Sequence, residues 1–169
     1  MATEPAVQAK KKERVCIFVD ASNYHYTLQW DIDYQKFCDY YKTRYELVKI
    51  FYYEGQHSKK SFLDQRPGRT ETEFLTQDAR KNRFFKKMRS LGYTVRTKPI
   101  SSVYDKTSGR SGLKCNFDVE LTIDALDQLP AYDTAILCSG DGDFTKLIRY
   151  LKGKGKNTIV VAAGERLST

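Results

Sequence analysis

The chain has 169 residues, of which 40% are hydrophobic and 13% aromatic, and its formal net charge is +8. This length suits one domain with a single sizeable core, and no apolar run approaches the roughly 18–20 residues that a membrane span needs, so we expect no membrane association. The basic surplus favours polyanionic partners but does not identify one.

The N-terminal residues 1–13 are polar and include the basic run Lys10–Lys12. They contain no apolar stretch of the kind that secretory signals have, so we interpret residues 1–13 as a disordered basic leader. The three lysines could contact nucleic acid, but a solvated tail is the simpler interpretation. Residues 14–169 are then expected to form a single domain.

The cysteines are far apart in the sequence and include no closely spaced pair: Cys16, Cys38, Cys115 and Cys138. Zinc sites and disulfide frameworks usually show characteristic spacings, and none is present here. Two of the four lie in apolar, strand-like runs. We therefore expect reduced thiols in a cytoplasmic protein.

The expected domain opens with an apolar strand, Arg14–Asp20, that ends in an acid and leads into a helix. Asp20 or Ser22 could simply be the cap of that helix, without any function. The presence of Asp141 and Asp143 after another strand favours a functional role for Asp20, because parallel strands bring their carboxyl ends to one edge of the sheet. Residues 30–41 are rich in aromatic side chains at roughly helical spacing. We expect them to pack on a sheet, with stacking on RNA bases as the alternative.

A second strand is predicted over residues 45–54, followed by a polar segment, residues 55–70, that contains glycine, proline and several basic side chains. We expect this segment to be a long surface loop on the same edge of the sheet as Asp20. Such a loop either binds phosphates or is merely solvated.

The longest helix is predicted over residues 71–91, with a basic face, and Gly92 is expected to end it. Residues 93–98 alternate like a strand. Residues 101–112 are rich in serine and glycine and are expected to form a mobile loop.

A further helix is predicted from Asp118, because Val119, Ile123 and Leu126 fall on one helical face. A carboxylate in the first turn is favoured by the helix dipole without any function. Asp124 follows about 9 Å further along the axis and about 120° around it, so the two acids can hardly reach one ion. We assign Asp118 to a site and Asp124 to the scaffold.

The most informative stretch is residues 134–151, which predicts a buried strand, a tight turn with the sequence SGDGD, and a helix. The two glycines allow the sharp turn, and Asp143 is expected to cap the helix. One cap needs one carboxylate, yet the turn carries two, Asp141 and Asp143, and the surplus acid lies where open α/β sheets bind their ligands. A last strand is predicted over residues 157–163.

Strands and helices therefore alternate, which predicts a parallel α/β sheet covered on both faces. Acids follow several of its strands: Asp20, Asp118, Asp141 and Asp143. Carboxylates close together raise one another's pKa unless a cation neutralises them, and hard oxygen ligands suit Mg²⁺ or Mn²⁺. A cation in such a cluster polarises phosphoryl oxygens and activates water, so the pattern favours metal-dependent phosphodiester hydrolysis.

Other kinds of site find no support in the sequence. The GDGD turn lacks the Lys-Ser/Thr of a phosphate-binding loop, and there is no GxGxxG motif. His25 and His57 have no matching nucleophile in a strand–turn–helix elbow, so an acid–base triad is not indicated.

Three segments resemble the signature segments of the NYN family, the LabA-like branch of the PIN-like nuclease superfamily. They are FVDASNY at 18–24, KCNFDVELTIDAL at 114–126 and SGDGDFTKLIRYLKGKG at 139–155. The resemblance implies a PIN-like three-layer α/β/α sandwich with a mainly parallel sheet, and a Mg²⁺- or Mn²⁺-dependent endoribonuclease. It implies catalytic, metal-binding roles for Asp20, Asp118, Asp141 and Asp143. It also implies substrate-binding roles for Asn23, Lys114 and Ser139.

The leading hypothesis is therefore a metal-dependent endoribonuclease whose partner is RNA, with DNA left open because nothing identified reads a 2′-hydroxyl. The alternative is a catalytically silent RNA-binding or regulatory module with the same fold, and a phosphatase ranks below both. Two departures from the family pattern leave points open. The basic segment 55–70 leaves the substrate preference open, and a shortened segment after Ala163 leaves homo-oligomer formation open.

Overall fold

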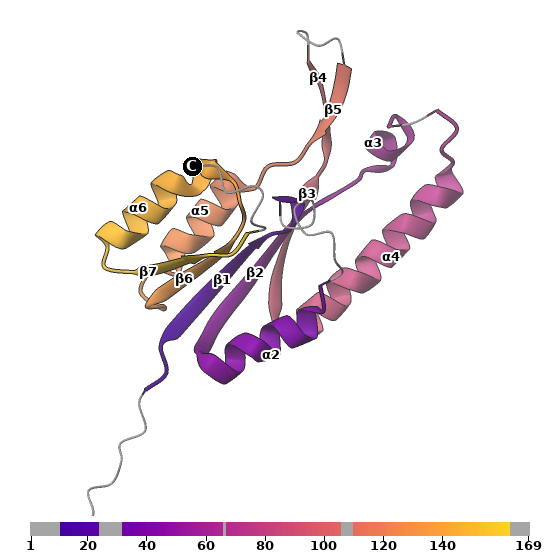
Figure 1. Cartoon of the computed structure of the whole chain (residues 1–169). Coiled ribbons are helices and arrows are strands. Elements are labelled where there is room, and N and C mark those ends of the chain that lie inside the picture. Colours follow the sequence, from indigo (N-terminus) through magenta and orange to yellow (C-terminus); the bar gives the residue numbers. More distant parts are fainter. Residues whose placement is uncertain (1–10, 24–31, 66, 106–109, 163–169) are drawn as a thin grey trace, which may run out of the picture.

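The computed structural model describes residues 11–23, 32–65, 67–105 and 110–162. Its centre is a five-stranded parallel sheet in the order β3-β2-β1-β6-β7 (Figure 1). The strands are β1 (Arg14–Asp20), β2 (Glu46–Gln56), β3 (Tyr93–Pro99), β6 (Thr134–Cys138) and β7 (Asn157–Val160). The predicted parallel α/β fold is confirmed.

Helices cover both faces of the sheet and make the three layers visible in Figure 1. One face carries α2 (Tyr34–Arg44) and α4 (Glu71–Ser90), and the other carries α5 (Asp118–Asp127) and α6 (Thr145–Gly153). Strand β1 contributes side chains to both cores, because successive side chains of a strand point to opposite faces of the sheet. Val15, Ile17 and Val19 lie in the first core, and Cys16 and Phe18 in the second.

The chain order of the strands places a topological switch point at β1. The chain runs outward from β1 through β2 to β3, and then returns to the other side of β1 as β6. In the β1–β6 register Val19 pairs with Cys138, so the residues that follow, Asp20 and Ser139, emerge together. Open parallel sheets bind their ligands at such a point, beyond the carboxyl ends of the strands.

The polar segment 55–70 is more regular than predicted. Strand β2 continues to Gln56, and a short helix, α3 (Lys59–Leu63), follows. The helix forms because the Ser58 hydroxyl accepts a hydrogen bond from the Ser61 N–H (3.1 Å) and because Phe62 is buried against the ring of Phe74 (5.7 Å between ring centroids). The prediction of a loop was therefore wrong for this part of the segment.

The predicted loop over residues 101–112 was also wrong. It forms an antiparallel hairpin of β4 (Ser101–Asp105) and β5 (Arg110–Lys114), which projects from the body of the domain (Figure 1). Serine and glycine are poor strand formers, so the sequence showed no strand pattern, yet the cross-strand pairing supplies the backbone hydrogen bonds.

Helix α5 turns a different face to the sheet than predicted. The predicted apolar face is exposed, with Val119 68% and Ile123 52% exposed. Leu121 and Ala125 are buried instead, together with the acidic Asp124. The face with Leu121 and Ala125 was not predicted to be buried, because it also contains the carboxylate of Asp124 and the prediction counted only apolar side chains.

Two other predictions are confirmed in the described residues. The described part of the aromatic segment, residues 32–41, packs on the sheet, since Tyr34 and Cys38 of α2 are buried in the core, and Trp30 lies outside the described residues. Gly92 follows α4 with a φ of 95°, a conformation that glycine adopts without strain. Among residues 11–23, 32–65, 67–105 and 110–162, no helix is long and apolar enough to cross a membrane.

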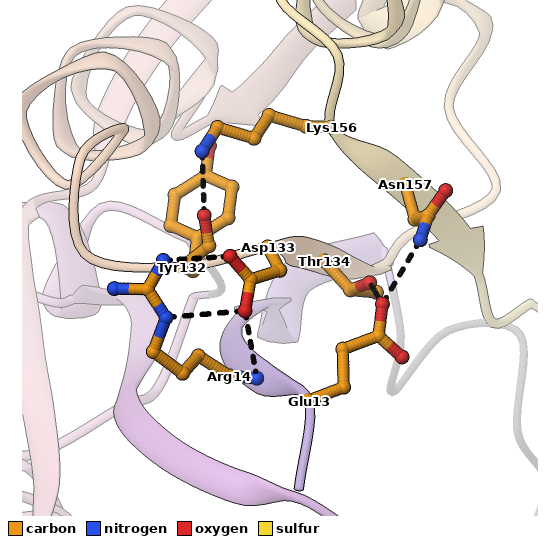
Figure 2. Close-up of polar contacts among 7 residues, drawn as sticks. All are labelled: Glu13, Arg14, Tyr132, Asp133, Thr134, Lys156 and Asn157. Carbon is orange, nitrogen blue, oxygen red and sulfur yellow. Dashed lines mark hydrogen bonds and ion pairs between the residues drawn. The ribbon is translucent and has the colours of Figure 1, made fainter. Parts of the chain in front are cut away.

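Most of the predicted leader, residues 1–10, lies outside the described residues. Its last residue, Glu13, and the first residue of β1, Arg14, contact residues at or next to the start of β6 and β7 (Figure 2). The Glu13 carboxylate accepts hydrogen bonds from Asn157 (2.9 Å) and from the Thr134 hydroxyl. The Arg14 guanidinium donates to both carboxylate oxygens of Asp133 (2.6 and 3.1 Å). These contacts join β1 to the start of β6 and β7.

The Arg14–Asp133 pair predicts a specific acid sensitivity. Hydrogen bonds from Arg14 lower the pKa of Asp133 to about 2, below its usual 3.8. Because the folded pKa is below the unfolded one, Asp133 stabilises the fold above about pH 4 and loses this effect as the pH falls through about 2. We expect the melting temperature of Asp133→Asn to be below that of wild type at pH 5–7 and to converge with it near pH 2. A difference that stays constant over this range would contradict the assignment.

Candidate active site

Asp20 is the centre of the candidate site, at the carboxyl end of β1. It continues the side of the strand that carries Cys16 and Phe18, so it faces the α5 layer and is only 8% exposed. Its Oδ2 accepts a hydrogen bond from the Ser139 hydroxyl (3.1 Å), and its Oδ1 accepts one from the backbone N–H of Asn23 (3.3 Å). The second bond resembles a helix cap, so Asp20 also stabilises the turn after β1.

The charges of two further acids affect the pKa of Asp20. Burial raises the pKa of Asp20, and the charges of Asp118 and Asp141 raise it further, whereas the hydrogen bonds from Asn23 and Ser139 lower it. Two of the other predicted acids, Asp118 and Asp141, are therefore close enough for their charges to act on Asp20. Asp20 and Asp141 follow adjacent strands, and Asp118 begins α5.

The turn after β6 holds Asp141 in place through a chain of hydrogen bonds. The buried Ser139 hydroxyl accepts from the Asp141 N–H (3.2 Å) while it donates to Asp20. The Asn23 side chain accepts from the Gly140 N–H (2.8 Å), which ties the turn after β1 to the turn after β6. Ser139 and Asn23 thus link the two strand ends directly.

The predicted helix cap at Asp143 was wrong. The chain enters α6 through a short 3₁₀ helix, η1 (Gly142–Phe144), and its cap is Asp141, whose Oδ1 accepts from the Asp143 N–H (3.0 Å). Helix α6 itself has no side-chain cap. Asp143 is exposed in the middle of η1, two residues beyond Asp141 in the chain.

Asp118 is oriented by Asn116, a residue that the sequence analysis did not single out. The Asn116 side chain donates to Asp118 Oδ2 (2.6 Å) and accepts from the Asp118 N–H (2.7 Å). Asparagine often forms such local bonds two residues ahead, so the Asn-x-Asp spacing was the available indication.

Asp124 belongs to the scaffold, as predicted. Its carboxylate accepts hydrogen bonds from the Tyr53 hydroxyl (2.9 Å) and from the Arg96 guanidinium (2.7 and 3.1 Å). Burial raises the pKa of Tyr53, and the neighbouring Asp124 raises it further, so the phenol stays protonated and donates. The group joins α5 to β2 and β3.

The acids at Asp20 fit a divalent cation by the chemistry of the donor set. A carboxylate whose pKa is raised by burial, and further by two neighbouring carboxylates, gains stability from a positive charge among them. The described residues contain no group of three or more His, Cys, Asp or Glu side chains already arranged to hold a metal ion. Lys114 lies in β5, and its side chain is outside what the structure describes.

Comparisons with known proteins show the family and the fold of the chain. The family model of the NYN domain matches residues 14–169. The chain is 34% identical over 160 residues to the low amplitude and bright protein LabA of Synechococcus elongatus, which covers 91% of this chain and 76% of LabA. A crystal structure of a protein of unknown function from Vibrio parahaemolyticus is similar in fold, with a TM-score of 0.69 and 25% identity, over 96% of this chain and 88% of that one.

Proposed function

The chain belongs to the NYN domain family, within the PIN-like nuclease superfamily, and from this premise we propose that it is a metal-dependent endoribonuclease. One observation carries the proposal: the buried Asp20 lies at the switch point of the sheet and is joined through the Ser139 hydroxyl to the turn that holds Asp141. Burial raises the pKa of Asp20, and the charges of Asp118 and Asp141 raise it further. Acids that repel one another in this way are costly for a fold, which is typical of a functional site.

Asp20, Asp118 and Asp141 would hold Mg²⁺ or Mn²⁺, with the exposed Asp143, two residues beyond Asp141, as a further acid of the site. When bound, the ion would polarise a phosphoryl oxygen and lower the pKa of a water molecule. Ser139 is buried, so its role is to hold Asp20 in position. Asn23 holds the turn after β6, and Lys114 would contact a phosphate of the RNA.

The free cysteines support a reducing location for the enzyme. All four cysteines are free, and three of them are buried. Burial raises the pKa of Cys16 to about 11, which keeps that thiol protonated and unreactive. Such thiols are typical of the cytoplasm, where we place the protein.

A silent RNA-binding module is the second candidate, and one observation favours it. Across the described residues, the carboxylates are not arranged as a ready-made metal site. An RNA-binding protein without turnover would need no such arrangement. Under this alternative the acids would only shape the surface.

The experiment that separates the two is an assay of wild-type protein on an end-labelled single-stranded RNA, with Mg²⁺ or Mn²⁺ and with EDTA. We expect internal cleavage with the metal and none with EDTA. RNA that is bound equally with and without metal, and never cut, would overturn the nuclease in favour of the binding module.

A further inference from the structure

A cavity of about 530 Å³ opens beside the acidic site. Ala21 and Ser22, which directly follow Asp20, line it, and so does Cys115. Burial raises the pKa of the Cys115 thiol, the charge of Lys98 lowers it, and the charges of Glu120 and Asp20 raise it. The volume is typical of pockets that enclose small organic ligands, about 300–1,000 Å³.

The walls of the cavity suit a flat ring. The rings of Phe62 and Phe74 lie 5.7 Å apart by their centroids, and both line the cavity, together with Ile100. Gly55 lines it too and packs closely: a Cβ atom there would lie 2.7 Å from Ile100 Cγ1 and 2.9 Å from Cys115 Sγ. The lining is therefore apolar and aromatic along one side.

The polar side of the cavity offers both donors and acceptors. The amide side chains of Gln56, Gln65 and Gln77 line it. The Gln56 NH₂ group already donates to Asp78 (2.9 Å) and Asn82 (3.2 Å), so its oxygen remains as an acceptor, and the Gln65 oxygen accepts from Arg69, so its NH₂ group remains as a donor. The Gln77 amide can both donate and accept. Burial lowers the pKa of His57, and the charge of Arg69 lowers it further, so the ring is neutral at pH 7 and carries one donor and one acceptor. Mixed groups of this kind match the edge of a heterocycle.

The charges that line the cavity leave no surplus cation for a phosphate. Lys81 is paired with Glu54, and burial lowers the pKa of the Lys81 ammonium. Glu54 also accepts a hydrogen bond from the Tyr52 hydroxyl (2.8 Å). The third lining charge is the carboxylate of Asp78, which accepts from Gln56 (2.9 Å). A neutral, planar ligand with polar edges therefore fits the cavity better than an anion does.

We infer that this cavity binds one nucleobase of the RNA, that of a nucleotide next to the cleaved phosphodiester. The inference rests on the proposed nuclease function, because the cavity adjoins Asp20 and a base held there leaves its phosphate at the acidic site. The base lies against Phe62 and Phe74, and its edge meets the glutamine amides and His57.

The test is a titration followed by NMR, with uniformly ¹⁵N-labelled protein in EDTA so that nothing is cleaved. The probes are AMP, CMP, GMP and UMP, with ribose 5-phosphate as the control that lacks a base. At least one nucleotide is expected to shift the amide signals of Gln56, His57 and Gln77, and ribose 5-phosphate is expected to leave them in place. Equal shifts from the sugar phosphate, or no shifts at these residues, would overturn the inference.

Two neighbouring residues of α4 provide a matched pair of variants. Phe74→Ala removes a lining ring and is expected to weaken nucleotide binding about fivefold or more, as for the loss of a base-stacking side chain. Leu75→Ala, at a position that is 57% exposed, is expected to bind like wild type. Equal binding by both variants, with both folded by their melting curves, would also overturn the inference.

RNA cleavage keeps this inference separate from the proposed function. Phe74→Ala is expected to raise KM for RNA more than it lowers kcat. Nucleotide binding in the cavity of a protein that never cuts RNA would leave the base site standing and remove the nuclease. Metal-dependent cleavage without base-dependent shifts would leave the nuclease standing and remove the base site.

Discussion

Replacing Asp20 with asparagine is expected to abolish metal-dependent RNA cleavage and, at the same time, to leave the metal-free fold at least as stable as wild type. The amide keeps an oxygen for the Asn23 N–H but removes the buried charge that a cation needs. The loss in cleavage rate is expected to be on the order of 10³-fold or more, as for the removal of a main electrostatic contact in an active site.

The stability half of this prediction follows from the sign of the pKa shift. Burial and the charges of Asp118 and Asp141 raise the folded pKa of Asp20 above its unfolded value. The group therefore favours the fold at low pH, and this favourable effect is lost as the pH rises through the folded pKa. At neutral pH the ionised carboxylate is a cost, which Asp20→Asn removes.

Melting curves of metal-free protein at pH 7 and single-turnover cleavage rates would measure both halves. The matched control is Asp127→Asn, at an exposed acid at the end of α5, which is expected to change neither. An Asp20→Asn variant that melts well below wild type would mean that the carboxylate is mainly structural. One that cuts RNA at the wild-type rate would remove Asp20 from the site.

The largest loss of stability is expected from Asp124→Ala. It leaves the fully buried hydroxyl of Tyr53 without its acceptor and removes both hydrogen bonds from Arg96. The Tyr53 hydroxyl is buried, whereas the ion pair joins a buried carboxylate to a half-exposed guanidinium. Leaving the hydroxyl unsatisfied and breaking this pair together cost about 2–4 kcal/mol, most of it from the hydroxyl. In a chain of this length that lowers the melting temperature by about 5–15 °C.

The same variant separates scaffold from site. Since Asp124 is committed to Tyr53 and Arg96, folded Asp124→Ala is expected to retain metal-dependent cleavage per folded molecule at a temperature well below its transition. Asp127→Ala, three residues along α5, is the control and is expected to stay within about 0.5 kcal/mol of wild type. Full loss of cleavage in folded Asp124→Ala would place this acid in the site.

The parallel sheet and its acidic edge could be predicted because they depend on local patterns. Asp20 and Asp141 follow buried apolar strands, and parallel strands bring such ends to one edge. The hairpin β4–β5 could not be predicted, because it depends on cross-strand pairing and a sequence rich in serine and glycine shows no strand pattern. The buried face of α5 was missed because Asp124 is made acceptable there by Arg96, which is distant in the sequence.

The cavity beside Asp20 was also beyond prediction from the sequence. Phe62 and Phe74 are in contact because α3 packs against the start of α4. Helix α3 lies in segment 55–70, whose composition is that of a loop, so this contact could not be predicted. The pairing of Lys81 with Glu54 joins α4 to β2, and nothing in either local sequence indicates it. Contacts of this kind depend on the packing of the elements and not on their periodicity.

The most direct measurement is the cleavage rate of a labelled single-stranded RNA as Mn²⁺ is titrated, for wild type and Asp141→Asn. The asparagine keeps the acceptor for the Asp143 N–H, so the turn after β6 is preserved. If Asp20, Asp118 and Asp141 hold the ion, wild type cuts only when Mn²⁺ is added and stops with EDTA, and Asp141→Asn does not cut at the same Mn²⁺ concentrations. Cleavage by Asp141→Asn at the wild-type rate would contradict a metal site at these aspartates.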